Sequence, residues 1–168
     1  SNFFTFGVAQ PVIEPPGGTA NNEVLVTITS ITSGAEIYWT INGSEPSRTN
    51  GTLYSQSFLL GTNGVLKAKA FRTGFADSAT SAQVFNLLTA APSIVPDGAV
   101  TNNAVLVRLA SETIGANIYW TIDGTTPSLT NGVKYTGLPF LLGTNGILIA
   151  RAFRDGFVPS QISASPFV

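Results

Sequence analysis

The residue types that carry most enzyme chemistry are scarce in this chain. It has no histidine and no cysteine, which excludes serine–histidine–aspartate and cysteine–histidine nucleophile systems. Carboxylates remain, and a pair of them can serve a glycosidase as acid and base. When the two halves of the sequence are aligned, however, Glu36 and Glu45 correspond to Asn117 and Thr126. We therefore expect no catalytic residues and no enzyme activity.

Metal binding is restricted for a similar reason. Zinc sites built on histidine or cysteine are excluded. Calcium prefers carboxylate and carbonyl oxygens, which loops around Asp97, Asp123 or Asp155 could supply. The chain has no Asp-x-Asp-x-Asp-Gly spacing, and the pair Asp123-Gly124 is explained by turn chemistry alone. We therefore expect no metal and no cofactor.

Aromatic side chains are the best candidates for binding a sugar, because a flat ring can stack on a pyranose face. Trp39 and Trp120 fall on the apolar side of their segments, as the core tryptophan of a sandwich does. Tyr38 and Tyr119 alternate to the wettable side, together with Thr40, and are the candidate glycan platform. Cross-strand packing on an exposed sheet also explains these tyrosines, and we slightly favour it.

An internal duplication organises these residues. The following segments return in the same order: Ile37–Gly43 as Ile118–Gly124, Leu59–Gly64 as Leu141–Gly146, and Phe71-Arg72 as Phe153-Arg154. A repeat of about 80 residues is too long for a solenoid and fits one small sandwich per copy. We predict two domains, residues 11–89 and 90–168, preceded by an apolar strand over residues 1–10.

Within each copy, apolar and polar residues alternate. Leu66, Ala68 and Ala70 share one side of their segment, and Lys67 and Lys69 lie on the other. A period of two with one apolar face is typical of antiparallel strands in a sandwich. Asn-Gly and Asp-Gly pairs separate these segments and mark turns. The expected fold is all-β, with two tandem antiparallel β-sandwich domains and no helix.

One ten-residue motif occurs in both copies. It reads Ile-Tyr-Trp-Thr-Ile-(Asn/Asp)-Gly-x-x-Pro at residues 37–46 and 118–127, and a tyrosine and a strand ending in Ala-Phe follow it each time. With these motifs the chain resembles the chitobiase/β-hexosaminidase C-terminal domain repeats, in two copies that span nearly the whole sequence. Asn42 and Ile149 depart from the Asp and the Lys of the family pattern. The resemblance implies immunoglobulin- or fibronectin-III-like sandwiches that accompany secreted bacterial enzymes or surface proteins and have no active site.

The composition limits the classes of molecule that the chain can bind. Charged residues make up 10% of the 168 residues, and the formal net charge is −1. Nucleic acids and anionic membranes require a basic face, and no run approaches the roughly 20 apolar residues of a membrane span. Without cysteine, packing rather than disulfides must hold the domains together. Together with the family resemblance, this predicts an extracellular or cell-surface location, in bacteria, with no nucleic acid as partner.

The two ends of the sequence repeat the end of the first domain. When the chain is aligned on the proline that follows, Phe3–Phe6 falls on Val84–Leu87, the expected last strand of that domain. At the other end, Phe167 aligns with Phe85. We therefore expect the chain to begin with the last strand of a domain that it does not contain, and to stop within the same strand of its second domain.

An unpaired apolar strand at the N-terminus would favour aggregation. Either the chain is excised from a longer array, or this strand adds to the sheet of a neighbouring subunit and builds a head-to-tail filament. We predict an extracellular structural module that assembles with copies of itself or neighbouring domains. Its expected coupling strand consists of Phe3, Phe4, Phe6 and Val8. The alternative is a carbohydrate-binding accessory module of a secreted glycoside hydrolase, with a polysaccharide as its partner.

Overall fold

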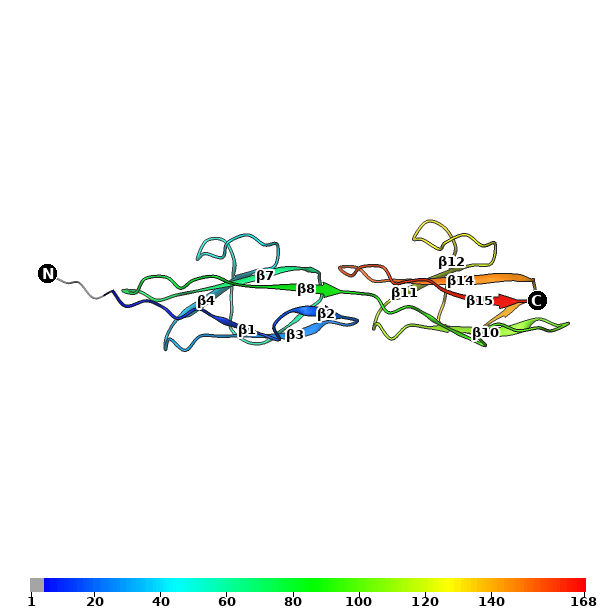
Figure 1. The fold of residues 1–168 in the computed structure, drawn as a ribbon, viewed down its shortest axis with the longest axis horizontal. Coiled ribbons are helices and arrows are strands. Elements are labelled where there is room, and N and C mark those ends of the chain that lie inside the picture. The colour runs from blue at the N-terminus through cyan, green and yellow to red at the C-terminus, as the bar shows by residue number, and fades with distance from the viewer. Residues whose placement is uncertain (1–4) are drawn as a thin grey trace. The chain divides into compact units, whose positions relative to one another are not determined.

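The structure, a computed structural model, describes residues 5–168. It divides between Asn86 and Leu87 into two compact units, called unit 1 and unit 2 below. The domain boundary expected from the sequence, between residues 89 and 90, lies slightly further along the chain. Every regular element of the described residues is a β-strand (Figure 1), which confirms the all-β fold. Among these residues no helix is long and apolar enough to cross a membrane.

Unit 1 is a sandwich of two sheets. Its strands are β1 (Val12–Glu14), β2 (Gly18–Ala20), β3 (Val24–Thr29), β4 (Glu36–Thr40), β5 (Thr52–Leu53), β6 (Phe58–Leu60), β7 (Gly64–Phe71) and β8 (Ser81–Leu87). One sheet has the order β2-β8-β7-β4-β5 and the other the order β1-β3-β6. The pairs β1/β3, β3/β6, β4/β5, β4/β7 and β7/β8 are antiparallel. In Figure 1 the layer of β7 and β8 lies above that of β1 and β3.

Unit 2 repeats this arrangement. Its strands are β9 (Ser93–Val95), β10 (Val105–Ala110), β11 (Asn117–Thr121), β12 (Val133–Lys134), β13 (Phe140–Leu142), β14 (Gly146–Phe153) and β15 (Ser163–Phe167). Its sheets have the orders β12-β11-β14-β15 and β13-β10-β9, and all pairs within them are antiparallel. At the position that β2 has in unit 1, Ala99 forms a parallel bridge with Phe167.

The alternation seen in the sequence decides which side chains enter each core. In β7, Leu66, Ala68 and Ala70 are fully buried, whereas Lys67 between them is half-buried on the outer face. Bulkier residues complete the core of unit 1, among them Phe85 of β8. Small alanines on one strand and large side chains on its neighbours fill a sandwich interior without voids.

The turn after β4 explains one failure of the alternation pattern. Gly43 has φ of 76°, a conformation that glycine adopts without strain. Asn42 Oδ1 accepts a hydrogen bond from the Ser44 backbone N–H at 3.1 Å. Thr40 Oγ1 donates to the Ser44 carbonyl at 2.6 Å. The sequence placed Thr40 on the wettable side, which was wrong: the side chain is buried because its hydroxyl is bound inside the turn.

A buried serine fixes the end of the long central strand in each unit. Ser78 Oγ accepts a hydrogen bond from the Ala70 N–H at 2.8 Å and donates to the Ala79 carbonyl at 2.8 Å. Ser160 repeats the arrangement and accepts from the Ala152 N–H at 2.9 Å. Both serines are buried, so they satisfy backbone groups that water cannot reach.

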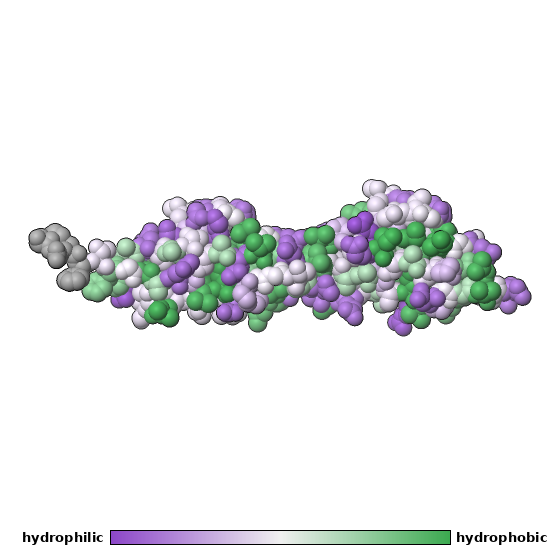
Figure 2. Space-filling view, in the orientation of Figure 1, coloured by the Kyte–Doolittle hydropathy of each residue, from purple (hydrophilic) through white to green (hydrophobic). Residues whose placement is uncertain are grey.

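Each unit also carries a pair of outward-facing leucines on its three-stranded sheet. Leu25 of β3 lies opposite Leu59 of β6, and Leu106 lies opposite Leu141 in unit 2. All four side chains are exposed. Figure 2 shows apolar residues interrupting the hydrophilic surface of both units on the face in view.

Candidate functional site

The segment Phe6–Val8 is held to unit 1 by its backbone. The Val8 N–H donates to the Ala76 carbonyl at 2.9 Å, and the Ala76 N–H donates to the Phe6 carbonyl at 2.8 Å. Gly7 thereby forms a parallel bridge with Ala76. Val8 is buried and belongs to the core of unit 1. We call this arrangement the N-terminal clasp. It ties Val8, one of the four expected coupling residues, to its own domain.

Unit 2 has the same clasp at its beginning. The Thr89 N–H donates to the Val158 carbonyl at 2.9 Å, and the Val158 N–H donates to the Leu87 carbonyl at 2.9 Å. Leu88 forms the parallel bridge with Val158. Thr89 therefore stands where Val8 stands in unit 1, and Leu87 stands where Phe6 stands. Along the chain, Leu87 is also the last residue of β8.

Phe6 differs from Leu87 in its exposure. Its side chain is 67% exposed, whereas Leu87 is fully buried. The Phe6 ring lies 5.6 Å from the ring of Phe75, and the Arg72 guanidinium lies 4.4 Å from the centre of the Phe75 ring. Phe6 thus presents an aromatic face at the beginning of unit 1. Phe3 and Phe4, the other expected coupling residues, lie outside the described residues.

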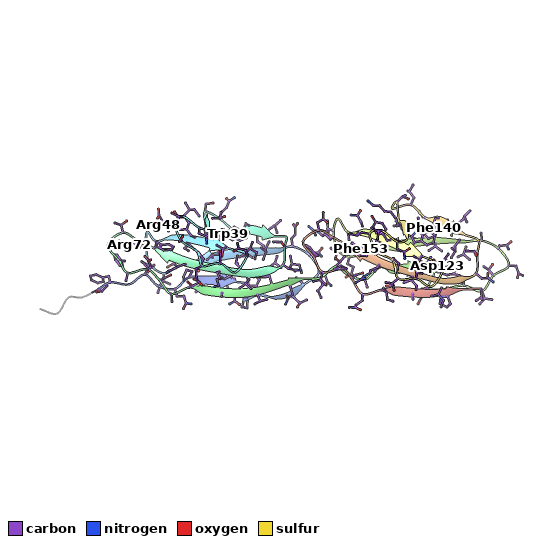
Figure 3. All side chains as sticks on the ribbon, turned by 90° about the horizontal axis from the view of Figure 1, so that it is seen from above. Trp39, Arg48, Arg72, Asp123, Phe140 and Phe153 are labelled. Carbon is purple, nitrogen blue, oxygen red and sulfur yellow. The ribbon has the colours of Figure 1, made fainter. Side chains whose placement is uncertain are left out.

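The tyrosines expected to form a glycan platform lie on the outer face of the larger sheet in each unit. The Tyr38 ring meets Phe71 edge to face, with ring centres 5.8 Å apart, and Tyr119 meets Phe153 in the same way at 5.7 Å. Both tyrosines are half-buried. The guanidinium of Arg48 lies 5.4 Å from the centre of the Phe71 ring. Figure 3 labels Arg48 in unit 1 and Phe153 in unit 2.

The tryptophans face the opposite way. Trp39 packs against the core of unit 1 and stacks on Phe58, with ring centres 4.3 Å apart, and Trp120 stacks on Phe140 at 4.4 Å. One face of each tryptophan ring is therefore covered by a phenylalanine ring. Figure 3 labels Trp39 in unit 1 and Phe140 in unit 2. Stacked pairs of this kind stabilise a core through area and ring geometry.

The carboxylates have structural partners. Glu45 accepts hydrogen bonds from Lys67 Nζ at 2.5 Å and from Thr80 Oγ1 at 2.8 Å. Both contacts lower the pKa of Glu45, and the hydrogen bond from Lys67 has the larger effect. Asp123 accepts from the N–H and the hydroxyl of Thr125, which lowers its pKa. Among residues 5–168, no three Asp, Glu, His or Cys side chains gather in a way that could hold a metal ion.

The other two acids considered for calcium are also separate. Asp97 accepts a hydrogen bond from Ser165 Oγ at 2.5 Å, and Asp155 is exposed in the turn before Gly156. Asp97 is thus tied to β15, while Asp123 caps the turn after β11. The three aspartates therefore lie in separate places. The partner of Asp123 is two residues away and follows from the local turn, whereas the partner of Asp97 is 68 residues away and is set by the fold.

A model of the chitobiase/beta-hexosaminidase C-terminal domain family matches the chain twice, over residues 15–82 and 95–164. The two matches coincide with the two duplicated copies, as the sequence motifs predicted. Domains of this family are accessory modules. A comparison with curated protein sequences gave no match.

Several solved structures are similar to the chain at low sequence identity. Murine CEACAM1b is 13% identical, with 96% of this chain and 99% of that chain covered and a TM-score of 0.32. The fibronectin(III)-like modules of Clostridium thermocellum CbhA are 12% identical, with 94% and 92% covered and a TM-score of 0.35. Drosophila OTK extracellular domains 3–5 are 13% identical, with 96% and 62% covered and a TM-score of 0.33. Because these scores are low, the assignment rests on the family match. The chain belongs to the chitobiase/beta-hexosaminidase C-terminal domain family, as two tandem β-sandwich domains.

Proposed function

We propose that this chain is a non-catalytic, extracellular structural module that joins copies of itself head to tail by β-strand addition, as part of a surface fibre or stalk. One observation carries the proposal. Phe6–Val8 clasps Ala76 in the way that Leu87–Thr89 clasps Val158. Leu87 is the end of a strand that comes from the preceding domain. Phe6 therefore occupies the position at which a domain receives the last strand of the domain before it.

The exposed ring of Phe6 supports the same proposal. An aromatic side chain that is 67% exposed leaves apolar area that an added strand would cover, and full burial of such a side chain contributes about 1.5–3 kcal/mol. In strand addition, backbone hydrogen bonds supply affinity and alternate side chains supply specificity. A contact between two different ends of the same molecule does not close on itself, so it extends into a filament.

The absence of catalysis is supported by the roles of the acidic residues. Glu45 bridges Lys67 and Thr80, and Asp123 caps a turn. A carboxylate pair for glycoside hydrolysis needs two acids facing one bound sugar, and these acids bind the protein's own side chains instead. The family takes its name from C-terminal domains of chitobiase and β-hexosaminidase, which act on glycans, and this supports an extracellular location.

Sedimentation velocity and electron microscopy of the purified chain test the proposal. We expect concentration-dependent, end-to-end oligomers, and we expect Phe6→Ser to shift them toward monomer. Leu25→Ser is the matched control, because Leu25 is also an exposed apolar residue of unit 1 but lies on the three-stranded sheet, opposite Leu59. Deletion of residues 1–5 removes Phe3 and Phe4 of the expected coupling strand and keeps Val8 in the core. A chain that stays monomeric at every concentration would refute the proposal.

A second candidate function is carbohydrate binding by the tyrosine platform. Its support is the repeated geometry: each unit presents a tyrosine edge-on to a phenylalanine on the outer sheet face, and Arg151 adds a cation 5.5 Å from the centre of the Phe153 ring. Pull-down with insoluble polysaccharides tests it. Binding that Tyr38→Ala or Tyr119→Ala abolishes, and that Leu25→Ala on the other sheet leaves intact, would support this function. No binding by the unsubstituted chain would exclude it for the polysaccharides used.

A further inference from the structure

The outer face of the larger sheet of unit 2 has a basic residue on each side of its tyrosine. Tyr119 of β11 lies opposite Lys134 of β12 and, on its other side, opposite Arg151 of β14. Neighbouring strands are about 4.8 Å apart, so the Cα atoms of the two basic residues lie about 10 Å apart across the tyrosine. Lys134 is exposed, and Tyr119 and Arg151 are half-buried. These three residues are called the basic row below.

Two contacts hold the Arg151 side chain in place. Its Nε donates a hydrogen bond to the Ser160 carbonyl at 2.9 Å, and its guanidinium lies 5.5 Å from the centre of the Phe153 ring. A guanidinium has five N–H donors in a planar fork, and this hydrogen bond uses one of them. A side chain that is already ordered loses less entropy when it binds a ligand. Arg151 is therefore suited to bind a carboxylate or sulfate group at the surface of the sheet.

The sheet that carries the basic row has no acidic residue to neutralise it. As the structure describes them, β11, β12, β14 and β15 contain no aspartate or glutamate. In unit 1, by contrast, Glu36 of β4 lies 3.4 Å from Arg48, and the exposed Leu53 lies opposite the tyrosine. Unit 2 has Asn117 in place of Glu36 and Lys134 in place of Leu53. The positive charge is therefore less balanced on the face of unit 2.

The acids in the neighbouring turns lie beyond the ends of the strands. Asp123 follows β11 and Asp155 follows β14. These two strands are antiparallel, so the two acids lie at opposite ends of the sheet. Asp123 also accepts hydrogen bonds from the backbone N–H and the hydroxyl of Thr125. Neither acid therefore belongs to the sheet face on which the basic row lies.

We propose that the basic row binds an acidic polysaccharide; the inference rests on the second candidate function, carbohydrate binding by the tyrosine platform, and names its ligand class and the unit that binds more tightly. The Tyr119 ring offers apolar area to a sugar, while Lys134 and Arg151 pair with carboxylate or sulfate groups on either side of it. A nucleic acid suits this surface less. Duplex DNA carries one charge per about 1.7 Å, whereas the row has two cations in a chain of formal net charge −1.

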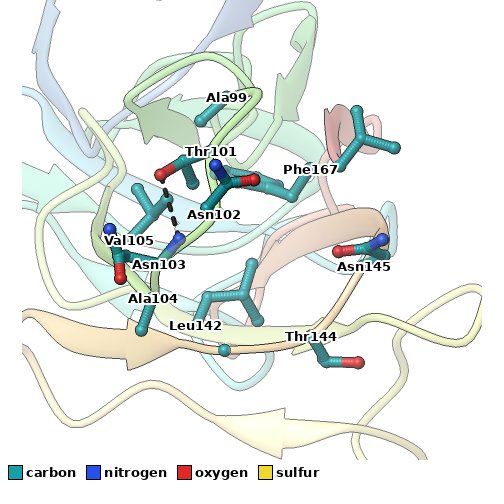
Figure 4. A pocket seen from close by; sticks show the side chains of 12 residues that line it. Ala99, Thr101, Asn102, Asn103, Ala104, Val105, Leu142, Thr144, Asn145 and Phe167 are labelled. Atoms are coloured by element: carbon teal, nitrogen blue, oxygen red, sulfur yellow. Dashed lines mark hydrogen bonds between the residues drawn. The ribbon is translucent and has the colours of Figure 1, made fainter.

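The pocket of unit 2 in Figure 4 shares no residue with the basic row. Its lining includes Asn102 and Asn145 from two loops, together with Phe167. Among the described residues, no lysine or arginine lines it. The pocket therefore offers hydrogen bonds but no positive side chain to an anionic ligand, and the sheet face is the better site.

Biolayer interferometry with immobilised polysaccharides tests the ligand class. Alginate carries carboxylates, dextran sulfate carries sulfates, and dextran is neutral. We expect the chain to bind at least one of the acidic polymers and to bind dextran about 10-fold more weakly or less. The acidic polymer that binds better identifies the group that is recognised. Binding should weaken as salt is added, because exposed charges are screened over about 8 Å at physiological ionic strength.

The outcomes separate the inference from the function on which it rests. Equal binding of dextran and the acidic polymers would overturn the inference and leave carbohydrate binding standing. Absence of binding to all three polymers would overturn both. Binding of single-stranded DNA as tightly as the acidic polymers would show that charge alone is recognised, and would overturn a polysaccharide as the specific ligand.

A charge reversal within the row locates the site. Lys134→Glu should weaken binding of the acidic polymer about 3- to 10-fold at low salt, because it removes an exposed attraction and adds a repulsion. Arg108→Glu is the matched control. Arg108 is also an exposed basic residue of unit 2, but it lies on β10 of the other sheet, so this variant should bind normally. An equal loss of binding in both variants would overturn the site.

Unit 1 allows a test by gain of binding, which a misfolded variant could not imitate. Glu36→Asn together with Leu53→Lys gives unit 1 the residue types that unit 2 has at these positions. Introduced into the Lys134→Glu chain, this pair of substitutions should restore binding of the acidic polymer. A chain that folds and does not regain binding would overturn the assignment of the ligand to the basic row.

Discussion

The two clasps differ in the hydrogen bonding of one side chain, and exchanging the residue types between them should change the stability of each unit in opposite directions. Thr89 and Val8 occupy the same position, and both are buried. The Thr89 hydroxyl has no hydrogen-bond partner among the described residues, although its backbone N–H is bonded to Val158. Valine has nearly the same shape without the polar group. We predict that Thr89→Val stabilises unit 2 and that Val8→Thr destabilises unit 1.

The size of the effect can be worked out from the cost of burying a hydroxyl. Without a partner this costs about 1–3 kcal/mol in protein mutational data. For a domain of about 60–100 residues, 1 kcal/mol changes the melting temperature by roughly 4–8 °C. The Thr89→Val substitution should therefore raise the transition of unit 2 by at least about 4 °C. The Val8→Thr substitution should lower the transition of unit 1 by a similar amount.

Differential scanning calorimetry at low protein concentration measures both units in one experiment, because association between copies would add its own stabilisation. Each single variant should move one transition and leave the other in place, which also assigns the two transitions to their units. Thr89→Ala serves as a control: it removes the hydroxyl but also a packed methyl group, so it should be less stable than Thr89→Val.

A Tm of unit 2 that is unchanged or lowered in Thr89→Val would refute the reasoning. It would mean that the hydroxyl has a partner or that the clasp of unit 2 is not packed as in unit 1. The equivalence of Phe6–Val8 with Leu87–Thr89, on which the proposed function depends, would then lose its energetic support.

Two further predictions concern groups that hold single units together. Ser160→Ala leaves the buried Ala152 N–H without its acceptor and should destabilise unit 2 by about 1–3 kcal/mol in urea unfolding, with unit 1 unchanged. Because Lys67 lowers the pKa of Glu45 in the folded chain, this carboxylate stabilises unit 1 above its ordinary pKa, and the contribution is lost as the pH falls through the lowered value. Unit 1 of Glu45→Gln should therefore lose less stability than the unsubstituted unit 1 between about pH 6 and about pH 3, and an identical pH dependence would contradict this.

The sequence predicted the fold well because the fold depends on short-range patterns. The alternation of Leu66, Lys67 and Ala68 indicates one buried and one wet face, and the two faces are found as expected. The apolar side of Trp39 likewise indicated a core position, where it stacks on Phe58. Such patterns are set by the two-residue period of a strand.

The N-terminal clasp was harder to predict from the sequence, because it depends on contacts between segments that are distant along the chain. Nothing near Val8 indicates that its N–H pairs with Ala76, so alternation alone placed Val8 with Phe6 in a free strand. Thr40 was misplaced for a similar reason, since only the folded turn shows its bond to Ser44. The clasp pairs Val8 with Ala76, far along the chain, and long-range contacts of this kind are not encoded in local periodicity.

The parallel pairing at the end of unit 2 has a mechanical consequence. Ala99 and Thr101 lie near the beginning of the unit and are bonded to Pro166 and Val168 at its end. Tension applied to the two ends of this unit would slide the parallel segments past one another, so the hydrogen bonds between them would share the load instead of opening one after another. Resistance to such a force depends on the rate of unfolding. A domain whose outer strands are loaded in shear is suited to withstand tension along a chain.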